Sequence, residues 1–258
     1  MLLLIDAGNT STTIGFCDKA GISNTLRLDT MPEAWGSGEY PGLLNDFIRG
    51  HQLKMPDGAS ICSVVPAVTP LISAALKKNY GINPVIVDHG TMTGLKFLRK
   101  NIEGLGPDRI SNAVAARGLY KGNLVVLDFG TATTVCVITE EGVYMGAAIM
   151  PGPALSAACL AERTARLPLV ELRTPVSLMG GDTESDILTG IILGHAGAVE
   201  RIINEINGEI KGDLNVVATG GLADLVTPYM KMIDYVNPLL TLEGLRLIYE
   251  INPKGGVL

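Results

Sequence analysis

The sequence predicts an α/β protein of two lobes with duplicated topology, each a mixed five-stranded sheet flanked by helices. The main observation is a motif that occurs twice. Asp6-Ala7-Gly8-Asn9-Thr10 follows the apolar run 2–5, and Asp128-Phe129-Gly130-Thr131 follows the apolar run 124–127. In both copies a hydroxyl-rich stretch and another apolar run come next, which is typical of a strand, a tight turn and a return strand. The two aspartates lie 122 positions apart in 258 residues, so the chain carries a half-length duplication.

The order of the remaining elements gives the type of sheet. After the first motif hairpin, the patterns predict a strand at 24–29, a polar connector at 35–40, a helix at 43–49, a strand at 59–65, a helix at 68–80 and a strand at 84–87. Three strands in a meander followed by helix, strand, helix and strand form a ribonuclease H-like lobe.

The second half of the chain repeats this order. We expect strands at 124–128, 133–139, 143–149 and 214–219, a long helix at 182–206 and a final helix at 240–251. Both helices are expected to complete the second lobe. Placing the boundary within the helix 109–119 gives an N-terminal lobe, 1–114, with the first phosphate loop, and a C-terminal lobe, 115–258, with the second.

Composition excludes several classes of protein. The net charge of −6 argues against nucleic acid or a membrane surface as the main partner. No apolar run reaches the roughly 20 residues that span a bilayer, and the start lacks the basic region of a signal peptide. The four cysteines have no Cys-x-x-Cys spacing, so we expect small core residues in a reducing cytoplasm.

The duplicated motif indicates a site for phosphate. Gly130 lets a ligand approach the backbone, and Thr131, Thr133 and Thr134 add hydroxyl donors. An aspartate beside such a turn would repel a phosphate unless a cation lay between them, so the motif predicts a metal–phosphate site. Two such lobes are expected to face each other across a cleft that binds a nucleotide.

A second candidate stretch is Gly104-Leu105-Gly106-Pro107-Asp108-Arg109, which precedes a predicted helix. Asp108 is either the N-cap of that helix or a base that accepts a proton from a substrate hydroxyl. Arg109 either holds an anionic group of the acceptor or forms a surface salt bridge.

Two glycine pairs complete the candidates. Gly220 and Gly221 lie between a strand and a helix, where they form either a plain turn or a flat surface for adenosine. Gly180 and Gly181 precede Asp182 and Thr183, which either cap the long helix or contact a ligand.

Together these motifs resemble type III pantothenate kinases. The chain carries in order Asp6-x-Gly8-Asn9-Thr10, Gly106-x-Asp108-Arg109-x-x-Asn112, Asp128-Phe129-Gly130-Thr131, Pro151-Gly152, Thr164-Ala165-x-Leu167-Pro168-x-Val170, Gly220-Gly221 and Leu242-Glu243-Gly244-Leu245. The resemblance implies the acetate and sugar kinase/Hsp70/actin fold, a homodimer, and transfer of the ATP γ-phosphate to pantothenate in the first step of coenzyme A synthesis.

The resemblance also implies roles for individual residues. Asp108 is the catalytic base, and Asp128 binds a monovalent cation, potassium or ammonium. Because phosphoryl transfer needs charge neutralisation, we also expect Mg²⁺ with ATP near Asp6, held directly or through water. The pantothenate contacts are Gly106, Pro107, Asp108, Arg109 and Thr183. The ATP contacts are Asp6, Ala7, Gly8, Asn9, Thr10, Ser11, Thr12, Thr13, Thr131, Gly220 and Gly221.

Departures from the family pattern concern the acceptor side. The stretch 97–103 has no tyrosine and no proline after Asn101, Pro107 replaces a small residue, and Gly181 stands where members often have lysine. A kinase of the same fold acting on another hydroxy acid or sugar is one alternative. A non-catalytic nucleotide-binding regulator is another, although such a protein has no need of a base at Asp108.

Overall fold

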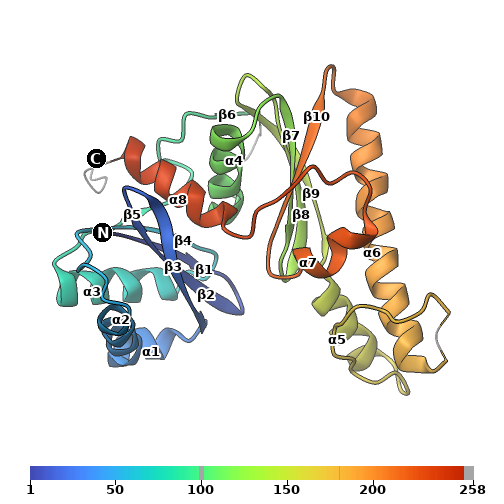
Figure 1. Cartoon of the computed structure of the whole chain (residues 1–258), viewed down its shortest axis with the longest axis horizontal. Helices are drawn as coiled ribbons and strands as arrows, with labels where there is room; N and C mark the ends of the chain where they lie inside the picture. Colours follow the sequence, from blue (N-terminus) through green and yellow to red (C-terminus); the bar gives the residue numbers. More distant parts are fainter. Residues whose placement is uncertain (99–101, 180, 253–258) are drawn as a thin grey trace. The chain divides into compact units, whose positions relative to one another are not determined.

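The computed structural model describes residues 1–98, 102–179 and 181–252, so Asn101 and Gly180 of the motifs above lie outside the described residues. The chain forms two compact units. The first unit comprises Met1–Leu95, Lys100–Gly118 and Leu240–Leu258, and the second comprises Lys96–Arg99 and Leu119–Leu239. Each unit is built around one mixed sheet (Figure 1).

The sheet of the first unit has five strands, as expected. Its order is β3-β2-β1-β4-β5, in which β3, β2 and β1 are antiparallel and β1, β4 and β5 are parallel. The bounds are β1 (Leu2–Ala7), β2 (Ser11–Asp18), β3 (Gly21–Asp29), β4 (Gly58–Ser63) and β5 (Val85–Ile86).

Helices cover the two faces of this sheet. The helices of the first unit are α1 (Pro32–Ser37), α2 (Glu39–Gly50), α3 (Val68–Tyr80), α4 (Pro107–Leu119, of which Leu119 falls in the second unit) and α8 (Leu240–Ile251). Side chains of α1, α2 and α3 pack on Leu3, Ile5, Ile14, Phe16 and Ile61, which alternate along the strands and form the core of one face. The opposite face, which carries Leu4, Asp6 and Cys62, is left for α4 and α8.

The polar connector expected at 35–40 is helical instead. Pro32 begins α1, and Gly38, with φ of +91°, ends it before α2 starts at Glu39. Proline suits the first turn of a helix and glycine its left-handed end, so these residues are helix boundaries rather than loop signals. Trp35 is 2% exposed, so this segment belongs to the core.

The C-terminal helix α8 has the expected bounds but belongs to the first unit, not to the second. It contacts β1 and β4. Leu242 lies over Gly15 and Tyr249 lies over Gly58, where the missing side chains leave room. The amphipathic pattern of 240–251 predicts a buried face, but it does not say which sheet that face covers.

The sheet of the second unit has six strands rather than five. Its order is β11-β10-β7-β8-β9-β6, and apart from β6 it repeats the order of the first sheet. The strands are β6 (Lys96–Phe97), β7 (Asn123–Phe129), β8 (Ala132–Ile138), β9 (Val143–Pro151), β10 (Leu214–Thr219) and β11 (Tyr235–Val236). The added strand β6 pairs in parallel with β9.

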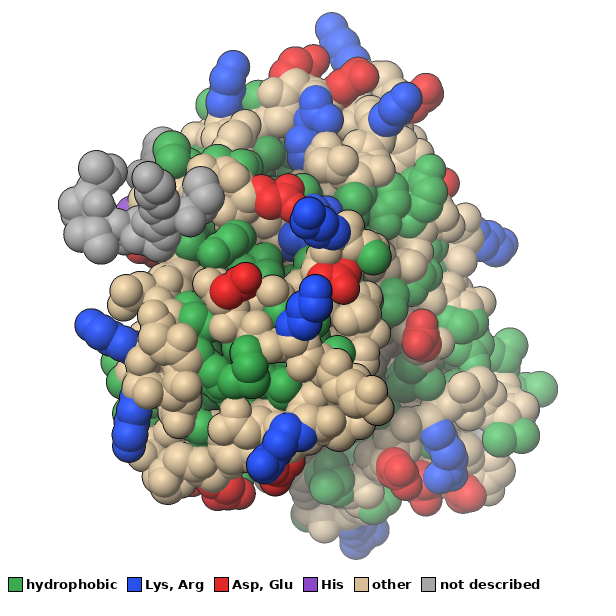
Figure 2. All heavy atoms as spheres, turned by 60° about the vertical axis from the view of Figure 1, so that its left-hand side comes forward, with side chains coloured by type: hydrophobic (Ala, Val, Ile, Leu, Met, Phe, Trp, Pro, Cys, Tyr) green, Lys and Arg blue, Asp and Glu red, His purple; other side chains and the backbone are tan. Residues whose placement is uncertain are grey.

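The helices of the second unit are α5 (Pro153–Arg163), the long α6 (Thr183–Glu209), α7 (Ala223–Val226) and a 3₁₀ turn at Thr227–Tyr229. Val199 and Ile203 of α6 pack on Val125, Leu127 and Phe129 of β7. None of the helices within the described ranges is long and apolar enough to cross a bilayer. On the face drawn in Figure 2, basic and acidic side chains are interspersed.

Candidate active site

The first motif forms the tight β1–β2 hairpin that the sequence predicts. The Gly8 N–H donates to the Ser11 carbonyl at 3.0 Å, which closes the turn and leaves Asn9 and Thr10 exposed. Thr30, at the end of β3, donates its hydroxyl to the Gly8 carbonyl at 2.7 Å. A hydrogen bond from the end of the neighbouring strand β3 therefore stabilises the turn.

The residues of this motif point to different faces of the sheet. Ala7 and Thr12 are opposite each other and fully buried, and the Thr12 hydroxyl lies 3.0 Å from that of Thr30. Asp6 and Thr13 are also opposite each other, one position along, so they lie on the face that α4 covers. The side chains of Ala7 and Thr12 are thus turned into the core, away from Asp6.

Asp6 lies in an unusual environment for a carboxylate. The Cys62 thiol donates to Asp6 Oδ1 at 3.1 Å. Burial raises the pKa of Asp6 to about 6, the Cys62 hydrogen bond opposes that rise, and the charge of Asp108 adds to it. The two carboxylates that the motifs single out in the first half of the chain therefore lie within electrostatic reach of each other.

Asp108 is the second residue of α4, so it is not the cap that precedes this helix. Its Oδ1 accepts a hydrogen bond from the Arg109 backbone N–H at 2.8 Å. Burial raises the pKa of Asp108, while the backbone N–H and the charge of Arg109 oppose that rise. Arg109 itself is 6% exposed, which contradicts the alternative of a surface salt bridge. Gly106 and Pro107 immediately precede Asp108, and their carbonyls accept from Ile110 and Ser111.

The second motif repeats the register of the first. Asp128 lies opposite Thr134 on β8, as Asp6 lies opposite Thr13 on β2. Thr133 takes the place of Thr12: its hydroxyl is fully buried and lies 2.9 Å from His195 of α6, so it does not line the turn as expected. Thr131, at the turn itself, is exposed.

The glycine pair lies directly against the second motif. Gly220 has φ of +96°, and a Cβ atom placed on it would lie 2.5 Å from the Asp128 Oδ1 and from the Phe129 nitrogen. Only glycine fits there. The Leu222 N–H donates to the Phe129 carbonyl at 3.1 Å. Gly220, the exposed Gly221 and the Asp128 turn thus form one continuous surface of the second unit.

Thr183 is the first residue of α6, and the residue before it caps that helix. The Ser185 N–H donates to the Asp182 carboxylate at 2.8 Å, and the Ser185 hydroxyl completes a capping box. Thr183 also lines an apolar groove of about 760 Å³ between α5 and α6.

The donors present fit a cation that is shared with phosphate. Within the described ranges, no three His, Cys, Asp or Glu side chains gather to form a protein-only metal site. Mg²⁺ usually takes one or two carboxylates and completes its shell with water and phosphate oxygens. The single carboxylates Asp6 and Asp128, each beside a turn, suit that mode of binding.

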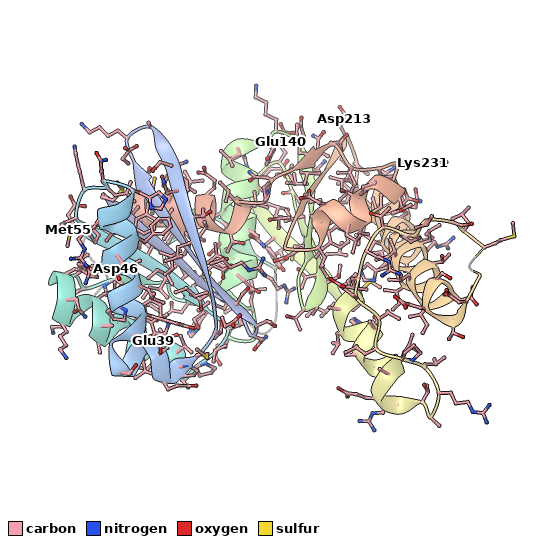
Figure 3. All side chains as sticks on the ribbon, turned by 60° about the horizontal axis from the view of Figure 1, so that its bottom comes forward. Glu39, Asp46, Met55, Glu140, Asp213 and Lys231 are labelled. Carbon is pink, nitrogen blue, oxygen red and sulfur yellow. The ribbon has the colours of Figure 1, made fainter. Side chains whose placement is uncertain are left out.

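A second concavity, of about 540 Å³, lies at the far end of the second sheet, where Glu140 and Asp213 project (Figure 3). Its amides are used internally: Asn123 donates to the carbonyls of Lys211 and Asp213, and Asn215 donates to that of Lys121. Its lining carries two lysines and four acidic side chains, so it is neither a basic site for an anion nor a purely acidic site for a cation.

Several residues around Asp6 and Asp108 are not identified by the motifs. Thr30 supports the first turn, Cys62 and Ser111 contact each other behind Asp6, and Thr241 of α8 donates to Asn112 of α4 at 2.8 Å. Thr30, Cys62 and Thr241 come from elements distant in the sequence from Asp108, whereas Ser111 lies on the same helix as Asp108. Of the residues in this region, only Asn112 and the tail 242–245 could be identified from the sequence, because they belong to the family motifs.

Comparisons with known proteins agree on one family. The sequence profile described as Type III pantothenate kinase matches residues 2–205. A Type III pantothenate kinase of Agathobacter rectalis is 39% identical over 261 aligned positions and covers all of both chains.

Solved structures give the same fold at lower identity. A Campylobacter jejuni protein assigned to the Baf family of transcriptional activators has a TM-score of 0.60 at 21% identity, over 97% of this chain and 98% of that one. A Sinorhizobium meliloti protein assigned as a 2-dehydro-3-deoxygalactonokinase has a TM-score of 0.59 at 14% identity, over 98% and 99% of the two chains.

Proposed function

The chain belongs to the type III pantothenate kinase family, and we propose that it phosphorylates pantothenate with ATP through the residues described above. This reaction is the first step of coenzyme A biosynthesis. The observation that best supports the proposal is that Asp6, beside a phosphate-type turn, and Asp108, at the start of α4, belong to one unit and lie close enough for the charge of Asp108 to affect Asp6.

The first turn is proposed to bind the ATP phosphates. Its exposed residues, Asn9 and Thr10, and the turn backbone provide donors for phosphate oxygens. Mg²⁺ bound with ATP would offset the negative charge of the phosphate oxygens. Asp6 would hold it directly or through water, while Ala7 and Thr12 contribute through their backbone because their side chains are buried.

Asp108 is proposed to orient the acceptor hydroxyl and take its proton as the new bond forms. Phosphoryl transfer depends mainly on positioning and charge neutralisation, so the base has a modest share of the work. The raised pKa of Asp108 suits this role, because a more basic carboxylate accepts a proton more readily. Gly106, Pro107, Arg109 and Thr183 are proposed as pantothenate contacts.

The second motif is proposed to bind the rest of the nucleotide and a monovalent cation. Thr131 and the Gly220-Gly221 turn form the ATP contacts, and Asp128 supplies an oxygen ligand for potassium or ammonium. Support comes from the contact between Gly220 and the Asp128 turn and from the net charge of −6, since a cation would offset the charge of a phosphate beside Asp128.

We further propose a cytoplasmic homodimer. The groove between α5 and α6 is lined by Met150, Cys159, Leu160, Leu167, Ile187 and Ile191, and Leu155 of the same helix α5 is 45% exposed. Exposed apolar surface of this kind is typical of an interface. The four free cysteines suit a reducing compartment.

The test is ADP release by the purified chain with Mg²⁺ and potassium, with and without pantothenate. A pantothenate kinase releases ADP only when pantothenate is present and yields 4′-phosphopantothenate. ATP binding with turnover on another hydroxy acid or sugar would replace pantothenate as the acceptor. Binding without turnover on any acceptor would overturn the proposal in favour of a regulator.

A further inference from the structure

We propose that Cys62 and Ser111 are positioning residues, which fix the Asp6 carboxylate and connect it to the helix that carries Asp108. The roles of Asp6 and Asp108 in this inference rest on the proposed function. The contacts themselves lie within the first unit and do not depend on it.

The first contact follows from strand register. Asp6 on β1 and Cys62 on β4 are direct neighbours in a parallel pair, so their side chains leave the sheet on the same face. The thiol donates to Asp6 Oδ1 at 3.1 Å, and Cys62 is fully buried. The thiol is therefore held inside the protein, where its hydrogen bond orients the Asp6 carboxylate.

A thiol has a particular advantage in this position. It is a weak donor that carries no charge, so it orients the carboxylate without neutralising it. A lysine or an arginine in the same place would form an ion pair and remove the negative charge that a cation needs. Cys62 thus holds Asp6 while leaving it free to act as an anion.

The second contact leads to α4. Ser111 contacts the Cys62 thiol and donates its hydroxyl hydrogen to the Pro107 carbonyl at 2.9 Å, in the turn that contains Asp108. Ser111 is fully buried. Its side chain therefore joins the first turn of α4 to the strand neighbour of Asp6, so the two carboxylates share one support.

The helix α8 fixes this support from the other side. A Cβ atom on Gly244 would overlap the Ser111 carbonyl, which means that α8 and α4 are in backbone contact at this point. Thr241, one turn earlier in α8, donates to Asn112 at 2.8 Å. Ser111 thus has little room to move away from Cys62.

The second unit has a related arrangement. Thr219 of β10 is the parallel neighbour of Asp128, as Cys62 is of Asp6, and it is 2% exposed. Both motif aspartates therefore have a small, buried side chain with a hydrogen-bonding group in the adjacent strand. If this position only had to fill space in the core, valine would serve as well, as it does at positions 216 and 217 of the same strand.

The experiment compares variants of Cys62 in the full chain. Cys62→Ala and Cys62→Val remove the donor, whereas Cys62→Ser keeps one. Cys17→Ala is the matched control, because Cys17 is also a buried cysteine of this sheet but its thiol faces the Asp18 carbonyl. The measurements are MgATP affinity without acceptor, the free Mg²⁺ that gives half-maximal rate, and kcat and KM for ATP.

We expect Cys62→Ala and Cys62→Val to weaken MgATP binding and kcat/KM for ATP about 10-fold, as loss of a hydrogen bond to a charged group does. Half-maximal rate should need more Mg²⁺. Cys62→Ser should stay within about threefold of wild type, and Ser111→Ala should lower kcat more than MgATP affinity because it acts on the turn of Asp108.

A double-mutant cycle separates positioning from general packing. If Cys62 acts through Asp6, then Cys62→Ala has no further effect on MgATP affinity in an Asp6→Asn background. Additive losses, or wild-type MgATP affinity and Mg²⁺ dependence in both Cys62→Ala and Cys62→Val, would overturn the inference. MgATP affinity needs no acceptor, so a failure of pantothenate as the substrate is recognised separately, by the absence of pantothenate-dependent ADP release from the wild type.

Discussion

At the scale of single residues, ionising Asp6 costs the folded protein free energy. Its pKa rises from 3.8 to about 6 on folding, chiefly through burial. A raised carboxyl pKa stabilises the folded state fully below pH 3.8, and this contribution is lost as the pH rises to about 6. Near neutral pH the enzyme therefore carries a destabilising carboxylate, as functional sites often do.

Replacing Asp6 by asparagine should remove this cost. We expect Asp6→Asn to unfold at a higher temperature than the wild type at pH 7.5, with a gain of up to about 3 kcal/mol in unfolding free energy. The gain should shrink by roughly 1 kcal/mol between pH 7.5 and pH 5. Thermal unfolding of both proteins in EDTA without nucleotide, across this pH range, measures it.

Asp29→Asn is the control, because Asp29 is an exposed aspartate of the same unit. It should change stability by less than about 0.5 kcal/mol at any pH. A pH-independent difference between Asp6→Asn and the wild type would contradict the assignment of the cost to ionisation. Turnover of Asp6→Asn should be strongly reduced whatever its stability, since the proposed cation contact is lost.

Asp108 makes a sharper prediction about chemistry. Asp108→Asn should keep MgATP affinity and lose about 10²-fold in kcat, the lower end of the range for a general base because the transition state is loose. Its fold should be retained, since an asparagine oxygen can still accept from the Arg109 N–H. Wild-type turnover in a folded Asp108→Asn protein would show that Asp108 serves only the first turn of α4.

At the scale of elements, the crossing of α8 over α4 depends on one glycine. Gly244→Ala would force a methyl group into the Ser111 carbonyl, so the two helices must separate. We expect a loss of about 2–4 kcal/mol in unfolding free energy, in the range of overpacking at a tight contact. Chemical denaturation measures this loss, and kcat should fall with it because Ser111 supports the turn of Asp108.

Gly208→Ala provides the matched control for this substitution. Gly208 also lies within a helix, α6, but a Cβ atom there meets nothing within 4 Å. Because alanine is the better helix former, Gly208→Ala should stabilise the protein by about 0.5–1 kcal/mol. Equal effects of the two substitutions would mean that helix propensity, not the crossing, governs Gly244.

The second turn predicts a cation requirement. Activity should be higher in potassium or ammonium than in sodium, and Asp128→Ala should weaken both that preference and ATP affinity. The comparison uses chloride salts of the three cations at equal ionic strength. Equal rates in sodium and potassium would remove the monovalent site and leave Asp128 beside the turn without a cation role.

The elements that were correctly predicted are those with local signals. The motif hairpins, α3 and the bounds of α8 follow from periodicity and turn residues over short stretches. The placement of α8 on the first sheet could not be predicted, because it depends on packing against β1 and β4, which lie more than 170 residues earlier in the chain. The Cys62 contact with Asp6 depends likewise on a parallel register across 56 residues, which the sequence does not display.

At the scale of the whole molecule, the duplication gives two similar aspartate sites, but the residues around each aspartate differ. Both units repeat the same strand order and the same pairing of an aspartate with a threonine. Their parallel neighbours differ: Cys62 and Ser63 in the first unit, Thr219 and Gly220 in the second. In the first unit a thiol of the adjacent strand donates to the aspartate, whereas in the second a glycine turn lies against it.

The proposed dimer gives the last prediction. Leu155→Glu places a charge at an α5 position that is 45% exposed beside the apolar groove, and burying that charge against a second copy would be costly. We expect the wild type to sediment as a dimer at micromolar concentration and Leu155→Glu to sediment near the 27.2 kDa of one chain. Leu43→Glu, at a position of α2 that is 42% exposed in the first unit, should remain dimeric. A wild-type monomer that turns over pantothenate would exclude the dimer, and a Leu155→Glu dimer would move the interface away from the groove.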